Sequence, residues 1–269
     1  MKQILIVCLS FLLFFNTASS QSKLGDAASV YVTTTNLDSS VAVYEKLGFQ
    51  KIGSNSFPAP WAQVSDGSLL ITMRKDATPY IGLTYYSSNV EKIAEQLEKD
   101  SIVFVQKPKA GDVIKRYYIK SPDGFTIVLS GNPGGFEQPK GMSMLNMKPE
   151  DYKNADKYPN KQCGVFGEFA HPVTELSKSI AFWKKLGFKI SYEMKEGEPY
   201  AIVSDSLMII GLHQTKEFTY PAITYFGINT EKRIEQLKDK GLQNFTEMGG
   251  KNNVILKTWE GQHLFIFSF

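Results

Sequence analysis

The hydrophobic pattern of the chain switches repeatedly between a period of two and a period near 3.6. Residues 28–34 alternate and are rich in β-branched side chains, which predicts a strand. An apolar stripe at helical spacing follows, with Asn36 or Asp38 as the expected cap and Gly48 as the stop. Further strands are predicted over 49–52, 61–64, 69–74 and 81–86, followed by a second helical stripe and three more strands ending at Leu129. The order β-α-β-β-β therefore occurs twice.

The second half of the chain repeats the first. Ser40–Phe49 and Ser179–Phe188 are identical at six of ten positions, and Asp123-Gly124 aligns with Glu260-Gly261. Residues 132–161 between the copies contain many prolines and glycines, which is typical of a linker. Since a repeat of this kind sets the whole fold, we expect two tandem domains, over 25–131 and 162–269.

The first twenty residues have the order of a secretory signal peptide. Lys2 precedes an apolar run from Ile4 to Phe15, and small polar residues lead to Ser20. The run is shorter than the roughly 20 residues that span a bilayer. We therefore predict cleavage after Ser20, no membrane association afterwards, and a mature protein that is periplasmic or extracellular.

Charge and cysteine content argue against several classes of function. Removal of Lys2 from the 30 basic residues leaves 29, against 27 acidic residues, a net charge of +2. The lysines are mixed with acids and not clustered as nucleic-acid binding requires. Cys8 lies in the signal peptide, so Cys163 has no disulfide partner and a cysteine-based zinc site is not expected. Phosphate-binding glycine loops and Gly-x-Ser-x-Gly motifs are missing from the sequence.

In each predicted half the helix covers only one face of the strands, so the other face is left without a partner. Two halves that curl together enclose a cleft with their other faces. A pocket between curved sheets is the expected site for a small-molecule ligand.

The repeated pattern resembles the vicinal oxygen chelate (VOC) superfamily, which includes glyoxalase I, bleomycin-resistance proteins and extradiol dioxygenases. The resemblance rests on the helix end Tyr44–Phe49, the closing turn Ser121–Phe125, and their counterparts Phe182–Phe188 and Trp259–Gly261. It implies an α+β fold with two tandem VOC domains, each a pair of βαβββ modules that form a curved sheet around a cleft. One chain then holds four modules, so a monomer is sufficient.

The resemblance also implies four strand positions for a divalent metal, which the family fills with His, Glu or Gln. The first domain offers Ser29, Thr72, Leu83 and Val128 at these positions, and the second offers Glu168, Gly211, Ile223 and Phe265. Only Glu168 has a side chain that could coordinate the metal, and one carboxylate alone does not hold a divalent ion in competition with water. No cofactor is therefore expected.

Strand alternation leaves a divalent metal possible at a displaced site. His213 lies two residues after Gly211, and His263 two residues before Phe265, so a period of two places both on the side of Glu168. Two histidines and one carboxylate form a ligand set for iron or zinc. Each histidine, however, is one pleat from the position that the resemblance implies. Polar pocket lining and rim positions are the alternatives for Glu168, His213 and His263.

The second cleft is the better candidate ligand site, because it is the more aromatic and alone contains histidine. Its expected ligand-binding residues are Phe166, Glu168, His213, Tyr225, His263 and Phe265. Glu168 is also the candidate catalytic residue, since a carboxylate desolvated among phenylalanines becomes a better general base. Trp61 and Tyr200, one strand earlier in each domain, are expected to close the mouths of the clefts or to pack in the core.

Three functions remain open from the sequence. The first is an exported protein that binds a small molecule in a cleft without the usual metal site. The second is a divalent-metal-dependent lyase or dioxygenase that uses the displaced site of the second domain. The third is a non-catalytic interaction module in which both clefts are packed.

Overall fold

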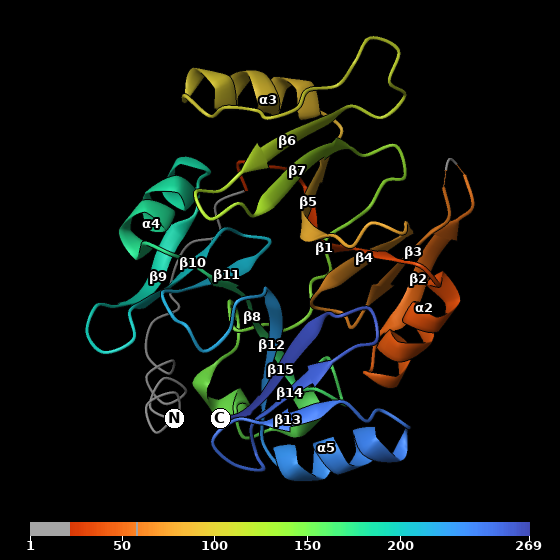
Figure 1. Cartoon of the computed structure of the whole chain (residues 1–269), viewed down its shortest axis with the longest axis vertical. Helices are drawn as coiled ribbons and strands as arrows, with labels where there is room; N and C mark the ends of the chain where they lie inside the picture. The colour runs from red at the N-terminus through yellow and green to blue at the C-terminus, as the bar shows by residue number, and fades with distance from the viewer. Residues whose placement is uncertain (1–21, 58) are drawn as a thin grey trace.

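Two mixed β-sheets dominate the protein (Figure 1). The computed structural model describes residues 22–57 and 59–269, so the predicted signal peptide lies outside the described residues. One sheet has seven strands drawn from residues 27–131, and the other has eight strands drawn from residues 165–268. The predicted α+β fold with paired βαβββ modules is confirmed.

The first sheet joins two modules through its central strands. Its elements are β1 (Ala27–Thr34), α2 (Leu37–Lys46), β2 (Gln50–Asn55), β3 (Trp61–Ser65), β4 (Leu70–Lys75), β5 (Ile81–Ser87), α3 (Val90–Lys99), β6 (Arg116–Lys120) and β7 (Thr126–Gly131). Strands β1 and β5 pair antiparallel at the centre, and each pairs in parallel with the last strand of its own module, β4 or β7. The sheet order is β2-β3-β4-β1-β5-β7-β6.

The second sheet repeats this arrangement. Its elements are β8 (Val165–Pro172), α4 (Leu176–Lys185), β9 (Lys189–Met194), β10 (Tyr200–Ser204), β11 (Ile209–His213), β12 (Ala222–Gly227), α5 (Thr230–Asp239), β13 (Phe245–Glu247), β14 (Val254–Lys257) and β15 (His263–Ser268). Strands β8 and β12 pair antiparallel at the centre, and they pair in parallel with β11 and β15. Two short 3-10 helices, Pro149–Asp151 and Ala155–Lys157, lie between the domains.

One predicted strand is shorter than expected. The second module of the first domain has two strands after its helix, and the third is reduced to a bridge between Gln106 and Tyr118. Pro108, two residues after Gln106, has no backbone N–H to donate, so the ladder does not continue along this segment. The corresponding segment of the second domain, which lacks proline, forms β13.

The helices cover one face of each sheet and leave the opposite, inner face uncovered. Helix α2 packs on β2–β4, and α4 packs on β9–β11. The ends of α2 follow the sequence: the Asn36 side chain accepts a hydrogen bond from the Ser39 N–H at 3.1 Å, and Gly48 has a φ of +92°. Trp183 of α4 is fully buried against its sheet. Among the described residues, no helix has the length and apolarity needed to cross a bilayer.

The outer faces of the central strands hold the two domains together. Tyr225 of β12 is fully buried and donates a hydrogen bond to Asp66 of the first domain at 2.5 Å. At the matching position Tyr85 of β5 faces Asp205 of the second domain, and burial raises the pKa of both groups. Each domain therefore supplies a tyrosine that faces the aspartate of the other domain.

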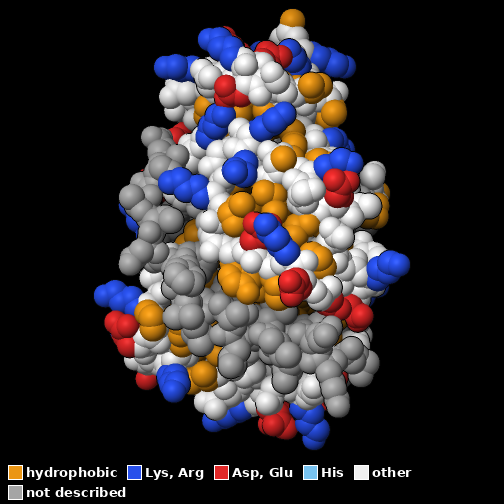
Figure 2. Space-filling view, turned by 90° about the vertical axis from the view of Figure 1, so that its left-hand side faces the viewer, with side chains coloured by type: hydrophobic (Ala, Val, Ile, Leu, Met, Phe, Trp, Pro, Cys, Tyr) orange, Lys and Arg blue, Asp and Glu red, His pale blue; other side chains and the backbone are white. Residues whose placement is uncertain are grey.

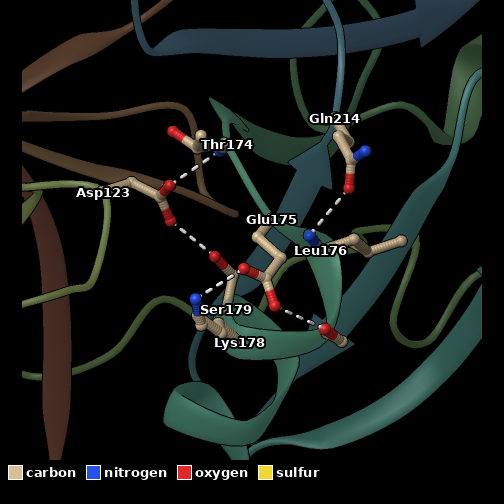
Figure 3. A network of polar contacts seen from close by, with 8 residues as sticks. Asp123, Thr174, Glu175, Leu176, Lys178, Ser179 and Gln214 are labelled. Atoms are coloured by element: carbon tan, nitrogen blue, oxygen red, sulfur yellow. Dashed lines mark hydrogen bonds and ion pairs between the residues drawn. The ribbon is translucent and has the colours of Figure 1, made fainter.

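The closing turn of each domain also binds residues of the other domain. The start of helix α4 contacts Asp123 of the first domain, while the Leu176 N–H donates to the Gln214 side chain of its own domain at 2.9 Å (Figure 3). The Asp123 carboxylate accepts hydrogen bonds from the Thr174 N–H at 2.8 Å and from the Ser179 hydroxyl at 2.5 Å. Reciprocally, Glu260 of the second domain accepts a hydrogen bond from Thr34, next to α2, at 3.2 Å. The Asp-Gly and Glu-Gly turns found as repeat landmarks thus act between domains.

Surface charge is mixed. On the face shown in Figure 2, lysine and arginine side chains are interspersed with acidic and hydrophobic ones. Charges of both signs therefore occur on the part of this face that the described residues form.

His171 belongs to the domain interface and not to the cleft. It lies on the outer face of β8, and its ring packs on Phe125 of the first domain with a centroid distance of 4.7 Å. Within the described chain neither ring nitrogen has a hydrogen-bond partner. Burial lowers the pKa of His171 from 6.5 to about 4.

This lowered pKa predicts that stability falls in mild acid. Between pH 6.5 and 4 the unfolded chain binds a proton at His171 that the folded chain does not, so stability present above pH 6.5 is lost as the pH falls. At pH 4.5 the loss from this residue amounts to about 2 to 3 kcal/mol. His171→Phe, which keeps an aromatic ring against Phe125, should remove that part of the pH dependence in urea unfolding at pH 7 and pH 4.5. Parallel stability curves for the two proteins would contradict the assignment.

Candidate functional site

The inner face of the second sheet forms a small cavity of about 70 Å³. Residues from β8, β10, β11, β12 and β15 line it, together with the loops before β10 and after β11. Three carboxylates contribute to the wall, Glu168, Glu198 and Glu217, and so do five aromatic rings, Tyr200, Phe218, Phe226, Phe265 and Phe267.

Glu168 is the central polar group of this cavity. It lies on the central strand β8 and is 5% exposed. Its Oε1 is 2.8 Å from His213 Nε2, and an Nε2–H tautomer donates this hydrogen bond. Its Oε2 and the Thr224 hydroxyl are buried without a hydrogen-bond partner among the described residues. The cavity wall therefore presents two buried polar atoms that are free to bind a ligand.

A glycine makes room for this carboxylate. A Cβ atom on Gly211 would lie 2.2 Å from Glu168 Oε2 and 2.4 Å from its carboxyl carbon. The carboxylate thus occupies the space that any other residue at position 211 would fill. The same strand β11 carries His213, two residues further along, so one strand provides both the space and the partner.

Aromatic rings fix the imidazole of His213. Tyr200 stacks on it with a centroid distance of 5.4 Å and an interplanar angle of 4°, and Phe218 contacts it edge-on at 5.5 Å. Phe218 also contacts Phe265 at 5.3 Å. Tyr200 therefore packs in the core and contributes its ring to the cavity wall.

The structure places three of the predicted ligand-binding residues, Glu168, His213 and Phe265, together in the cavity wall. Placing Phe166 and Tyr225 there was wrong. The pairing of β8 with β12 shifts register, so Thr224 lies opposite Glu168 and Tyr225 opposite Phe166, and Gly167 forms a bulge between them. The extra residue turns Phe166 to the outer face, where its ring contacts Tyr225 at 6.2 Å.

The true wall residues of β12 are Thr224 and Phe226, which sequence parity placed on the outer face. One signal in the sequence points to them: the first domain also has a threonine, Thr84, at the position that matches Thr224. Glu198, Glu217 and Phe218 were missed because they lie in loops, for which strand alternation makes no prediction.

His263 lies beside the cavity and does not join its wall. Its ring stacks on Tyr220 with a centroid distance of 3.4 Å. Partial burial, with a smaller contribution from Lys257, lowers the pKa of His263 from 6.5 to about 4. His263 thus lies on the same face of β15 as Phe265, as alternation predicts, but its ring is directed toward Tyr220 and not into the cavity.

The donor set does not fit the metal that the resemblance implies. In the part of the chain that the structure describes, no three His, Cys, Asp or Glu side chains come close enough to hold a metal ion. The predicted convergence of Glu168, His213 and His263 was wrong, because only the first two meet. Gly211, Thr224 and Phe265 occupy the other relevant wall positions and provide no nitrogen or carboxylate ligand.

The inner face of the first sheet is closed. Ser29, Thr72 and Tyr86 bind one another through hydroxyl hydrogen bonds of 3.0 to 3.2 Å. Phe136, from the segment after β7, packs edge-on against Tyr86 at 4.9 Å and against Trp61 at 5.6 Å. We call the inner faces of the first and second sheets the first and second cups. The two cups differ, because a linker side chain packs into the first and the second keeps a cavity.

The fold is that of the extradiol dioxygenases of the VOC superfamily. Homoprotocatechuate 2,3-dioxygenase from Brevibacterium fuscum superposes with a TM-score of 0.58 at 14% identity, over 94% of this chain and 73% of the enzyme. The 2,2',3-trihydroxybiphenyl 1,2-dioxygenase of Sphingomonas wittichii gives 0.56 at 13% identity over 93% and 91%. The 2,3-dioxygenase LapB of Pseudomonas gives 0.57 at 12% identity over 93% of both chains.

The resemblance to VOC proteins inferred from the sequence is therefore confirmed for the fold. No protein-family model matches the sequence, and no curated protein matches it either. The superpositions show a shared fold, whereas identities of 12 to 14% carry no information on shared chemistry. The site of this chain has to be interpreted from its own residues.

The Gly211 contact predicts a specific defect. Gly211→Ala should displace the Glu168 carboxylate, break its hydrogen bond to His213 and destabilise the protein by about 1 to 3 kcal/mol, as expected for overpacking. The double variant Glu168→Ala/Gly211→Ala should recover much of this loss, because the clashing group is gone. Urea unfolding of both variants measures the effect, with Gly53→Ala as the control, because a Cβ atom there makes only ordinary van der Waals contact with Trp61 at 3.6 Å. Additive losses in the double variant would contradict the contact.

Proposed function

We propose that the second domain binds a small organic molecule in its cup, without a metal ion, through the Glu168–His213 pair. The observation that carries this proposal is the unpaired Glu168 Oε2, buried over Gly211 at the wall of an aromatic cavity. A buried carboxylate oxygen without a partner costs free energy, commonly about 1 to 3 kcal/mol. A ligand that donates a hydrogen bond to it removes this cost.

The walls of the cavity support binding of an organic group. Phe265 and Phe267 stack at 5.4 Å with an interplanar angle of 19° and form a flat apolar surface. Small-molecule sites commonly combine such apolar walls with a few convergent polar groups. A volume of about 70 Å³ restricts the buried part of the ligand to a headgroup or one ring edge, because pockets for drug-sized ligands measure about 300 to 1,000 Å³.

The dioxygenases with this fold suggest the first neutral probe. One of them is a halotolerant catechol dioxygenase. Catechol has two hydroxyl donors on a flat ring, and these match the carboxylate and the aromatic walls of the cup. In this test catechol serves as a ligand and not as a substrate, because the donor set for a metal ion is incomplete.

Binding is tested by calorimetric titration of the metal-stripped protein in EDTA with catechol, choline and benzoate as neutral, cationic and anionic probes. At least one probe should bind, and Phe265→Ala should weaken that binding by about tenfold, as expected for loss of a ring contact. Trp61→Ala, in the closed cup, is the matched aromatic control and should leave affinity unchanged.

Two results would contradict the proposal. The first is the lack of measurable heat or melting-temperature rise for all three probes at millimolar concentration, since a bound ligand must stabilise the folded state. The second is binding that appears only after ferrous or zinc ions are added.

We also propose that the protein is exported and loses residues 1–20. The chain is anchored directly after this segment: the Ser22 hydroxyl donates to Asp205 at 2.7 Å, Lys23 pairs with Asp100 at 2.5 Å, and Leu24 is fully buried. These contacts hold the residues that directly follow the predicted cleavage site, as expected for the N-terminus of a mature domain.

Export predicts a defined N-terminus. Expression of the full chain in a bacterial host, followed by fractionation and intact-mass analysis, should give a periplasmic or secreted protein that starts at Gln21. Replacement of Leu12 and Leu13 in the apolar run by arginine should block this processing. A cytoplasmic product that retains Met1, or one that stays in the membrane fraction, would contradict export.

A further inference from the structure

The second cup has an unusual charge pattern for a small cavity. Three of its lining residues are glutamates, and none is lysine or arginine. Glu168 is buried on the central strand, whereas Glu198 is half-buried and Glu217 is exposed at the mouth. His213 binds one oxygen of Glu168, and among the described lining residues no lysine or arginine lies opposite the three carboxylates of the wall. Acidic side chains on the wall therefore outnumber basic ones.

Aromatic faces surround this charge. Tyr200, Phe218, Phe226, Phe265 and Phe267 all line the cavity. The face of an aromatic ring has a negative quadrupole that attracts cations, and cages of such rings bind methylated ammonium groups. A carboxylate at the base of an aromatic cage is suited to the same ligand, because both parts of the wall attract positive charge.

We infer that the second cup binds an organic cation, with an ammonium or methylated ammonium headgroup beside Glu168 and among the aromatic rings. This inference rests on the proposed ligand-binding function and specifies the class of ligand. The headgroup lies against Glu168 Oε2, the oxygen that His213 leaves unbound. A protonated amine also donates a hydrogen bond there, whereas a trimethylammonium group makes only electrostatic and ring contacts. The small volume admits the headgroup and leaves the rest of the ligand at the mouth, between Glu198 and Glu217.

The first cup provides an internal contrast. The positions that match Glu168 and His213 are Ser29 and Arg74, and the matching positions differ by 139 residues in both cases. Burial raises the pKa of Tyr31, next to them, while Arg74 and Arg116 oppose the shift, so cations and not carboxylates act on this inner face. Preference for a positive ligand is thus a property of the second cup and not of the fold.

The test compares two ligands of the same shape. Choline and 3,3-dimethyl-1-butanol differ in that a quaternary nitrogen replaces a quaternary carbon, so only one of them is charged. In calorimetric titrations of the mature protein at low salt, choline should bind about tenfold more tightly or better. Glu168→Gln keeps the shape of the side chain and should weaken choline binding more than binding of the neutral alcohol, and so reduce this preference about threefold or more. Glu196→Gln, an exposed residue of the neighbouring loop outside the cavity wall, is the control and should leave the preference intact.

A second variant keeps the test decisive if Glu168→Gln does not fold. Phe218→Leu retains an apolar wall but removes a ring face, and it should reduce the preference for choline about threefold or more. Equal affinities of the wild-type protein for choline and the alcohol would overturn the inference. Catechol binding that depends on Phe265, together with equal affinities for the two matched ligands, would overturn the cation assignment and leave the proposed function standing. Failure of every probe to bind would overturn both.

Discussion

The exchange of buried polar contacts between the two copies is the constraint on which the structure depends. Tyr225 reaches Asp66, Tyr85 faces Asp205, and Asp123 binds Thr174 and Ser179 at the start of a helix of the other domain. Each copy supplies the group that its partner would otherwise leave unpaired in the interior, where such groups are costly. The domains therefore stabilise each other, and the outer faces of both central strand pairs are committed to the interface. Only the inner faces remain for a ligand.

The two inner faces diverge through a few substitutions at matched positions. Ser29 and Thr72 of the first cup satisfy each other and Tyr86 through short hydroxyl contacts, and Phe136 fills the remaining space. In the second cup the serine position holds Glu168 and the threonine position holds Gly211. The longer carboxylate needs the space that the missing side chain provides. A closed polar cluster is thereby replaced by a charged group that retains one unpaired oxygen.

Periodicity and the repeat were sufficient to predict the fold, because helix stripes, stop glycines and closing turns are local signals. They also placed Glu168, His213 and Phe265 on one wall, since these residues lie on strands with regular alternation. The prediction for Tyr225 was wrong because alternation along β12 was started one residue out of step; its counterpart Tyr85 also lies opposite the face of Ser29, in a sheet pair that has no bulge. The prediction for Phe166 was wrong because the bulge at Gly167 adds one residue to one strand only. Alternation along a single strand does not reveal such a shift, which is fixed by its pairing partner. The direction of His263 likewise depends on Tyr220, a loop residue.

The bulge that misled the sequence interpretation also determines the chemistry of the cup. Gly167 allows the Phe226 ring to approach the strand, because a Cβ atom there would lie 2.4 Å from that ring. Gly211 fixes where the Glu168 carboxylate can lie, and His213 fixes its rotation. Both partners of Glu168 are on strand β11, so the carboxylate is held in place before any ligand arrives. A group ordered in advance loses little conformational freedom on binding, so even a small cavity can bind its ligand selectively.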